Sequence, residues 1–213
     1  MAAALRIIPI ENGRFAENCY LVAEAGSADA VIVDPGEEPD RFLSVARREG
    51  LVIREIWLTH AHIDHVSGVA EVKAATGAPI YLHPADRPLY DNLSKQAAMF
   101  GLEVGDPPPP DRALIHGGTV SIGAASFAVR HTPGHSLGSV CFVAPGLVLG
   151  GDVLFQGSIG RTDLPGGSFD RLIRSIREEL LTLDDATVVY PGHGPPTTVG
   201  VERRANPFLI GVA

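Results

Sequence analysis

The segment Thr59–His65 constrains this chain more than any other feature of its sequence. It places three histidines and one aspartate within six residues, directly after a compact apolar run. Such a group has no packing role, because each polar side chain would need its own hydrogen-bond partner once buried. On an extended backbone His60 and His62 point to the same side. A turn into a following helix can then direct Asp64 and His65 toward a second point nearby, so we expect one loop to serve two adjacent metal ions.

Three later residues also stand at the ends of apolar, strand-like runs and next to glycine. His135 and His193 each follow a Pro-Gly pair, and Asp152 follows a Gly-Gly pair. Binding residues are often placed in this way on a rigid scaffold. None of the candidates is a thiolate, whereas structural zinc sites usually recruit cysteines. Asp152 is the only carboxylate among the later candidates, so we expect it to bridge two cations about 3.5–4 Å apart.

The succession of apolar runs and helical patterns predicts an α+β fold with two successive halves. We expect strands at 18–23, 30–33, 53–58, 80–82, 119–122, 126–131, 139–143, 147–149 and 187–190, and helices from Pro39 to Gly50, from His65 to about Thr76 and from Ser168 to Leu180. Two strand-then-helix halves favour two sheets packed face to face with helices outside, a four-layer αββα sandwich. The proline-rich segment 106–111 is expected to cross between the halves, and residues 1–213 to form a single domain.

Composition and net charge limit the classes of molecule that the protein is expected to bind. The formal net charge is -8 and no basic run is present, so nucleic acid is not an expected partner. No apolar stretch approaches the roughly 20 residues that cross a bilayer, and Arg6 and Pro9 interrupt the N-terminal apolar segment, which does not resemble a signal peptide. These observations predict a cytoplasmic enzyme without a membrane contact. Cys19 and Cys141 lie in apolar runs and are expected to be free and buried.

The order of these residues resembles a known family. The HxHxDH run at His60–His65, followed by His135, Asp152 and His193, is similar to the metallo-β-lactamase superfamily over nearly the whole chain. Within that superfamily the chain most resembles the glyoxalase II group (hydroxyacylglutathione hydrolases), in the short form that lacks the extra helical domain. The run Gly160–Gly167 is also similar to the short form.

The resemblance implies a ligand set and a reaction. It assigns His60, His62 and His135 to one divalent ion, Asp64, His65 and His193 to a second, and Asp152 to a bridge between them. We expect zinc, with iron and manganese as alternatives. The implied reaction is hydrolysis of S-lactoylglutathione or a related acyl-glutathione by a metal-bound hydroxide. Asp64 would also orient that hydroxide, and Asp34, in its Asp-Pro-Gly turn, would orient a metal-binding histidine.

Two positions depart from the long form of glyoxalase II, which holds the glycine carboxylate of glutathione with a lysine and a tyrosine. Here the corresponding residues are Arg161 and Asp163. Arg161 is a candidate substrate-binding residue, because a guanidinium binds a carboxylate through two hydrogen bonds. Equally, Arg161 and Asp163 could pair with each other and fix the loop.

Other functions stay open at this point. A persulfide dioxygenase acting on glutathione persulfide shares the fold and a Gly-Arg-Thr-Asp run, and would hold a single iron through the equivalents of His60, His135 and Asp152. The Leu-Pro-Gly-Gly sequence after Asp163 favours the hydrolase. A lactone hydrolase needs the same hydroxide, whereas a β-lactamase, a nuclease and a purely structural metal domain are less expected. The remaining histidines, His83, His116 and His131, match no ligand position.

Overall fold

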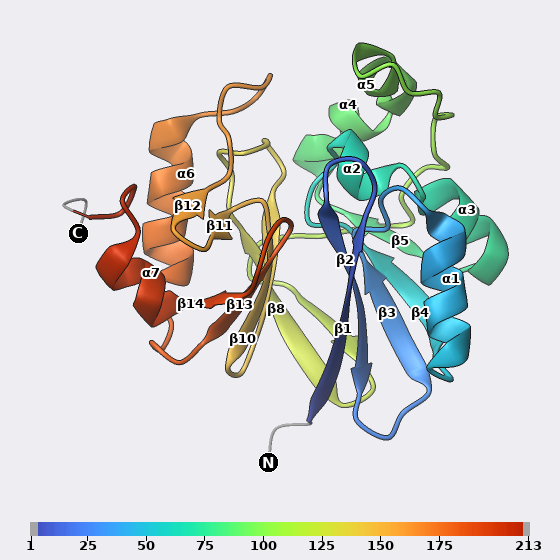
Figure 1. Ribbon diagram of the computed structural model, residues 1–213, viewed down its shortest axis with the longest axis horizontal. Helices are drawn as coiled ribbons and strands as arrows, with labels where there is room; N and C mark the ends of the chain where they lie inside the picture. The colour runs from blue at the N-terminus through green and yellow to red at the C-terminus, as the bar shows by residue number, and fades with distance from the viewer. Residues whose placement is uncertain (1–3, 211–213) are drawn as a thin grey trace.

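Two six-stranded sheets form the centre of the molecule in the computed structural model, which describes residues 4–210 (Figure 1). The strands of the first sheet lie in chain order: β1 (Leu5–Asn12), β2 (Glu17–Glu24), β3 (Asp29–Val33), β4 (Val52–Trp57), β5 (Ile80–Leu82) and β6 (Arg112–Ala113). β1, β2 and β3 pair antiparallel, and β3 to β6 pair parallel. The parallel strands therefore all end at the same edge of the sheet.

The second sheet is built from the later half of the chain. Its strands lie in the order β14 (Thr197–Thr198), β13 (Val188–Pro191), β10 (Leu147–Gly151), β9 (Val140–Ala144), β8 (Ala125–His131) and β7 (Thr119–Ile122). All neighbours pair antiparallel except β10 and β13, which are parallel. A small hairpin of β11 (Leu154–Phe155) and β12 (Ser158–Ile159) follows β10. Consequently β8, β10 and β13 also run in one direction.

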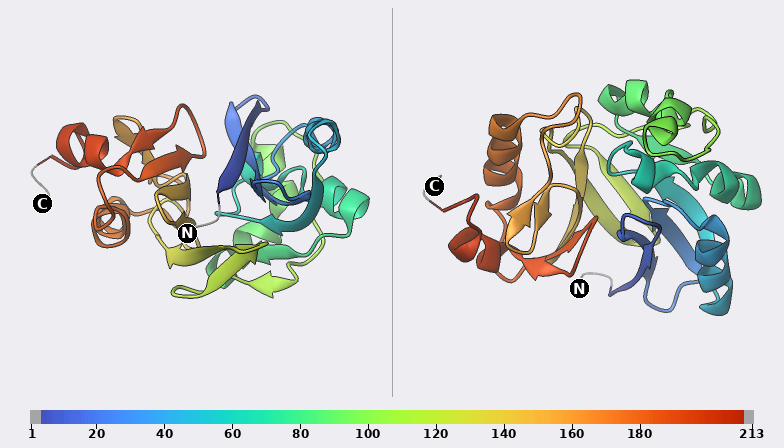
Figure 2. Two further views of the ribbon diagram at one scale, coloured as in Figure 1. Left: turned by 90° about the horizontal axis from the view of Figure 1, so that it is seen from below. Right: turned by 45° about the horizontal axis from the view of Figure 1, so that its top comes forward.

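Helices cover the outer face of each sheet (Figure 2). The first sheet is flanked by α1 (Pro39–Arg48), α2 (Ile63–Val66), α3 (Val69–Thr76), α4 (Arg87–Tyr90) and α5 (Leu93–Met99), with a 3-10 turn at Pro84–Asp86. The second is flanked by α6 (Phe169–Ser175), which continues as a π-helical turn at Ile176–Leu180, and by α7 (Val199–Ala205). Among residues 4–210, no helix has the length and apolar character needed to span a membrane.

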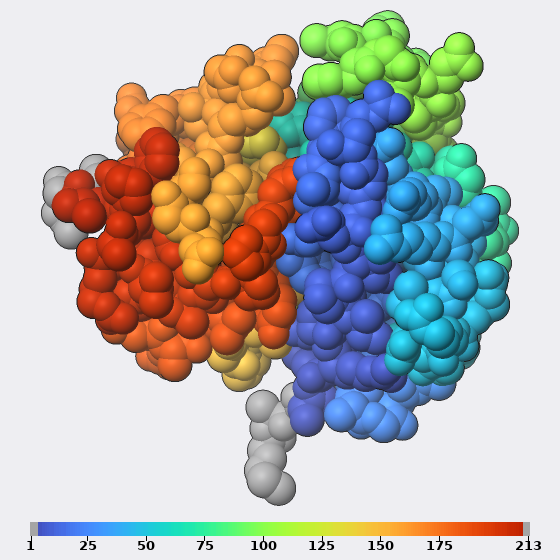
Figure 3. Space-filling model, viewed as in Figure 1, coloured from blue at the N-terminus to red at the C-terminus, as the bar shows by residue number. Residues whose placement is uncertain are grey.

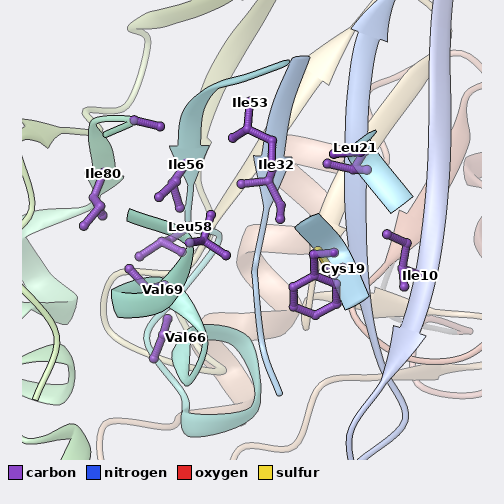
Figure 4. Packing of buried hydrophobic residues seen from close by; sticks show 14 of the residues in the cluster. Ile10, Cys19, Leu21, Ile32, Ile53, Ile56, Leu58, Val66, Val69 and Ile80 are labelled. Atoms are coloured by element: carbon purple, nitrogen blue, oxygen red, sulfur yellow. The ribbon is translucent and has the colours of Figure 1, made fainter. Parts of the chain in front are cut away.

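Three separate layers of buried side chains hold the four layers of structure together. One lies between the first sheet and its helices (Figure 4), one between the two sheets, and one between the second sheet and α6. β2 illustrates the alternation, since Cys19 and Leu21 face the helices while Tyr20 and Val22 face the other sheet. The expected four-layer sandwich with two sheets is confirmed.

Three local predictions were wrong or incomplete. β1 was not predicted, because Arg6 and Pro9 interrupt its apolar pattern; it is an edge strand, where a proline is tolerated. The predicted helix from His65 is broken into α2 and α3, since Gly68 lies against the turn after β3 and donates a hydrogen bond to the carbonyl of Pro35 at 3.0 Å. Nor does segment 106–111 cross between the halves, because β6 follows it within the first sheet.

Several short elements were not predicted from the sequence. These are β6, β11, β12, β14 and α7, of which the four strands have two residues each. The position of such a short strand is determined by the strand it pairs with, because two residues are too few to form an apolar pattern. The other predicted strands agree with the structure to within two residues at either end.

Candidate metal centre

Seven candidate ligands meet at one end of the sandwich. They lie on the loops and helix starts that follow β4, β8, β10 and β13, whose last residues all lie on the same side of the molecule. The residues are His60, His62, Asp64, His65, His135, Asp152 and His193. The structure brings together all of the positions that the sequence singled out as ligands.

Three imidazoles form the first group. The Nε2 atoms of His60 and His135 are 3.1 Å apart, and Nδ1 of His62 lies 2.8 Å from Nε2 of His135. All three residues are at most 8% exposed. Three ring nitrogens therefore converge on one point from two loops that are far apart in the sequence.

The second group combines two histidines with a carboxylate. Oδ2 of Asp64 lies 3.2 Å from Nε2 of His193 and 3.7 Å from Nε2 of His65. Asp152 lies between the groups. Its Oδ2 atom is 3.5 Å from the Nε2 atoms of both His135 and His193, and its Oδ1 atom is 3.4 Å from Nε2 of His65.

Four of the five histidines are held by the ring nitrogen that faces away from the centre. Nδ1 of His60 contacts the hydroxyl of Thr59 at 3.1 Å, and Nδ1 of His65 contacts Oδ2 of Asp34 at 3.0 Å. Backbone carbonyls hold the other two: Arg161 O lies 2.8 Å from His135 Nδ1, and Phe15 O lies 3.0 Å from His193 Nδ1. Each contact leaves Nε2 directed at the centre, the usual arrangement around metal-binding imidazoles.

Burial and neighbouring charges shift the pKa of a histidine in the first group and of one in the second group in opposite directions. Burial lowers the pKa of His62 to about 3, and the neighbouring His135 acts in the same direction. The pKa of His193 is raised to about 10; burial lowers it, but hydrogen bonds to Asp152 and Asp64 outweigh burial. Burial raises the pKa of Asp152, yet His65 and His193 hold it well below its usual range. His60 and His62 thus offer neutral nitrogens, and the second group pairs histidines with carboxylates.

These residues fit divalent metal ions. Within the described chain, Nε2 of His65 and Oδ1 of Asp152 are buried and have no hydrogen-bond partner, a costly arrangement unless another group satisfies them. The donors are nitrogen and oxygen only, which suits zinc, iron and manganese. The separations of 2.8–3.7 Å between donor atoms bracket the roughly 3.3 Å expected between ligands about 2.0–2.1 Å from one tetrahedral ion.

Asp86 is a site residue that sequence reasoning missed. Its fully buried carboxylate accepts hydrogen bonds from the N–H of Ala61, the hydroxyl of Ser136 and the N–H of Gly138. Ala61 lies between two ligand candidates and Ser136 follows His135, so Asp86 ties the two loops together. Its position beyond the end of an apolar parallel strand was a usable signal.

The positions that we expected to be unrelated to metal lie outside the cluster. His83 and His131 stack on each other with ring centroids 4.1 Å apart, and His116 accepts a hydrogen bond from the backbone of His131. Cys19 and Cys141 are free and buried, as expected.

Asp34 lies beside the candidate ligands. It contacts His65 and also accepts hydrogen bonds from both the N–H and the hydroxyl of Thr59.

A pocket opens directly above the two groups. His62, Asp64, His135, Asp152 and His193 form its floor, and its volume is about 480 Å³. Its rim comes from three segments: the β1–β2 turn, the α4–α5 region and the stretch that follows β12. In Figure 3 the first two lie side by side at the top of the molecule, and the third faces them.

Arg161 lines this pocket, but its side chain is paired. Nε and one terminal nitrogen of Arg161 each lie 2.7 Å from an oxygen of Asp163. Both side chains are more than half exposed. This bidentate contact matches the loop-fixing interpretation, while the carbonyl of Arg161 holds His135.

Comparison with known proteins gives the same family as the motifs. The metallo-beta-lactamase superfamily domain matches residues 12–193. A curated relative, "Hydroxyacylglutathione hydrolase GloC" of Haemophilus influenzae, is 38% identical over 96% of this chain and 97% of its own length.

Solved structures agree with this assignment. A crystal structure described as BLEG-1 B3 metallo-beta-lactamase superposes with a TM-score of 0.91 at 38% identity, covering 97% of this chain and 100% of its own. TTHA1623 in a di-iron-bound form gives 0.88 at 45% identity, with 95% and 100% covered. ETHE1 from Myxococcus xanthus gives 0.78 at 27% identity, with 95% and 83% covered. The chain thus belongs to the metallo-beta-lactamase superfamily and is a metal-dependent hydrolase within it.

Proposed function

We propose that this hydrolase cleaves acyl-glutathione thioesters, with S-lactoylglutathione as the reference substrate, into a carboxylic acid and free glutathione. One observation carries the proposal: two groups of ligand residues share Asp152 at the floor of a pocket that is open to a small molecule. The similarity to GloC over nearly the full length of both chains supports the choice of thioester.

Two divalent ions fit this arrangement. We place one among His60, His62 and His135, the other among Asp64, His65 and His193, and Asp152 between them. We expect zinc in both positions; iron is the first alternative, since the similar protein TTHA1623 was solved with two irons. When bound, such ions supply Lewis-acid activation of water and of a carbonyl oxygen.

The protein's own contribution to the reaction centres on Asp64. Its carboxylate lines the pocket and is 17% exposed, so it can contact a water there. Burial raises its pKa, but the neighbouring His65 and His193 prevail and keep it ionised. We assign to it the orientation of the attacking water and the acceptance of one proton. A carbon–oxygen bond forms, the carbon–sulfur bond breaks, and the thiol leaves with a proton.

The test is hydrolysis of S-lactoylglutathione by purified protein reconstituted with zinc, followed by the loss of thioester absorbance. His62→Ala serves as the control, because it removes one nitrogen from the first group. Rapid turnover that disappears in this variant supports the proposal. Absence of turnover by protein that holds two equivalents of zinc contradicts it.

Persulfide dioxygenation is the second candidate, favoured by the likeness to ETHE1. It needs a single iron, for which His60, His135 and Asp152 would suffice. Iron-loaded protein that consumes oxygen with glutathione persulfide, and leaves S-lactoylglutathione intact, would establish this activity instead.

A further inference from the structure

The wall of the pocket above the metal centre is apolar. Large apolar side chains contribute to it, among them Phe15, Leu89, Met99, Phe100, Phe155 and Leu164. They come from four separate segments of the chain, so the apolar character does not follow from one amphipathic helix. A wall of this kind binds a ligand mainly through removal of apolar surface from water.

Two aromatic rings close one side of this wall. Phe15, in the β1–β2 turn, packs edge to face against Phe100 at the end of α5, with ring centroids 5.3 Å apart at 82°. The backbone carbonyl of Phe15 also contacts His193. The aromatic pair is therefore held at a fixed place relative to the proposed metal ligands.

The rim exposes apolar surface that the protein itself does not cover. Phe100 is 42% exposed and Met99 is 75% exposed, although both line the pocket. Neighbouring large apolar residues at the mouth of a pocket indicate a ligand contact more often than isolated ones do. A small hydroxyacyl group such as lactoyl, which carries one methyl, would leave most of this surface in water.

The scarcity of cationic side chains in the pocket lining also favours an apolar ligand group. Of the described residues that line the pocket, Arg161 is the only arginine or lysine, and Asp163 holds its guanidinium through two hydrogen bonds. Glutathione carries two carboxylates, which find no unpaired cation among these lining residues. The acyl half of a thioester is thus better placed against the side of the pocket formed by Phe15 and Phe100, and the glutathione half away from it.

We infer that the pocket selects thioesters whose acyl group is apolar and larger than lactoyl, such as an aromatic 2-hydroxyacyl group. This inference rests on the proposed thioester hydrolysis and specifies its substrate class. Phe15 and Phe100 are the residues that determine the selection, because their rings pack against each other on the pocket wall and the carbonyl of Phe15 contacts His193.

The test compares S-mandeloylglutathione with S-lactoylglutathione, which differ only in a phenyl ring in place of a methyl. We expect kcat/KM to be roughly tenfold or more higher for the mandeloyl thioester, the range for added apolar groups in a fitting pocket. Phe100→Ala should lower kcat/KM for the mandeloyl thioester and so remove most of this preference. Phe208→Ala is the matched control, because Phe208 is 41% exposed and does not line the pocket.

A binding measurement separates this inference from the proposed function. S-phenacylglutathione and S-acetonylglutathione are thioether ketones that cannot be hydrolysed and differ in the same phenyl and methyl groups. Calorimetric titration of zinc-loaded protein should show the phenacyl compound binding about tenfold more tightly. Tighter phenacyl binding without any thioester hydrolysis would support the inferred pocket preference and contradict the proposed thioester hydrolysis. Equal binding of the phenacyl and acetonyl compounds overturns the inference even if both thioesters are cleaved. A higher kcat/KM for the lactoyl thioester than for the mandeloyl thioester also overturns it.

Discussion

The carboxylate of Asp86 lies 2.7 Å from the hydroxyl of Ser136, and through this contact it joins two loops that carry candidate metal ligands. The same carboxylate accepts the N–H of Ala61 from the other loop. Burial raises the pKa of Asp86, and its hydrogen bonds with Ser136, Gly138 and Ala61 partly offset this. Asp86 is therefore a positioning residue that touches neither the pocket nor a ligand side chain directly.

Asp86→Ala is expected to destabilise the protein by about 3 kcal/mol, because it leaves three buried donors without an acceptor. Urea unfolding measures this free energy, and zinc content measures the effect on the site. Asp91→Ala is the control, since Asp91 forms an exposed ion pair with Arg87 and should change stability by less than about 0.5 kcal/mol. Similar losses of unfolding free energy and of zinc in Asp86→Ala and Asp91→Ala would contradict the positioning role assigned to Asp86.

Asp34→Asn should weaken the metal ion of the second group more than that of the first. Asp34 contacts the ring of His65 directly, whereas it reaches His60 only through the hydroxyl of Thr59. Asparagine tolerates the positive φ of 51° at this position, so the turn is kept while the charge is lost. Loss of such a supporting carboxylate typically costs about 10–100-fold in metal affinity.

The measurement is a competitive titration of zinc against a chromogenic chelator, which resolves a tight and a weak equivalent. Asp29→Asn is the control, because Asp29 begins β3, the strand that ends just before Asp34, and among residues 4–210 its half-exposed carboxylate pairs only with Arg54 of β4. Equal weakening of both equivalents in Asp34→Asn would contradict the separate roles of the two ligand groups.

The candidate ligands could be found from the sequence because each is marked locally. The cluster from His60 to His65 has no packing explanation, and His135, Asp152 and His193 stand beside glycines at the ends of apolar runs. The side chains that complete the site were harder to find. Asp86 acts through two backbone N–H groups and one hydroxyl that are distant in the sequence, and its residue type carries no ligand motif.

Backbone atoms of the site cannot be identified from residue types at all. The carbonyls of Phe15 and Arg161 hold two of the histidines, yet any residue supplies a carbonyl. Likewise β1 was missed because tertiary position decides whether Pro9 is tolerated, and an edge strand tolerates it. The four-layer arrangement was predictable, since it follows from two successive halves in which apolar strand-like runs are combined with helical patterns.

Arg161→Ala is expected to leave KM for S-lactoylglutathione unchanged. The guanidinium is paired with Asp163, and its contact with His135 uses a backbone carbonyl that alanine keeps. If Arg161 instead bound a substrate carboxylate, KM would rise roughly tenfold or more, because loss of a charged hydrogen bond costs about 1.5–3 kcal/mol. Steady-state kinetics of Arg161→Ala beside Asp163→Ala distinguish the two roles.

Gly192→Ala should abolish metal binding, whereas Gly194→Ala should not. A Cβ atom at Gly192 would lie 2.2 Å from Oδ1 of Asp152 and 2.7 Å from Cε1 of His65. Both neighbours are buried, so the bridging carboxylate must shift and overpacking should cost about 1–3 kcal/mol. At Gly194 a Cβ meets open space but a positive φ of 73°, which costs about 1–2 kcal/mol by itself. The two variants should therefore lose similar stability, and their zinc contents distinguish them. Full zinc occupancy in Gly192→Ala would contradict the bridging role proposed for Asp152.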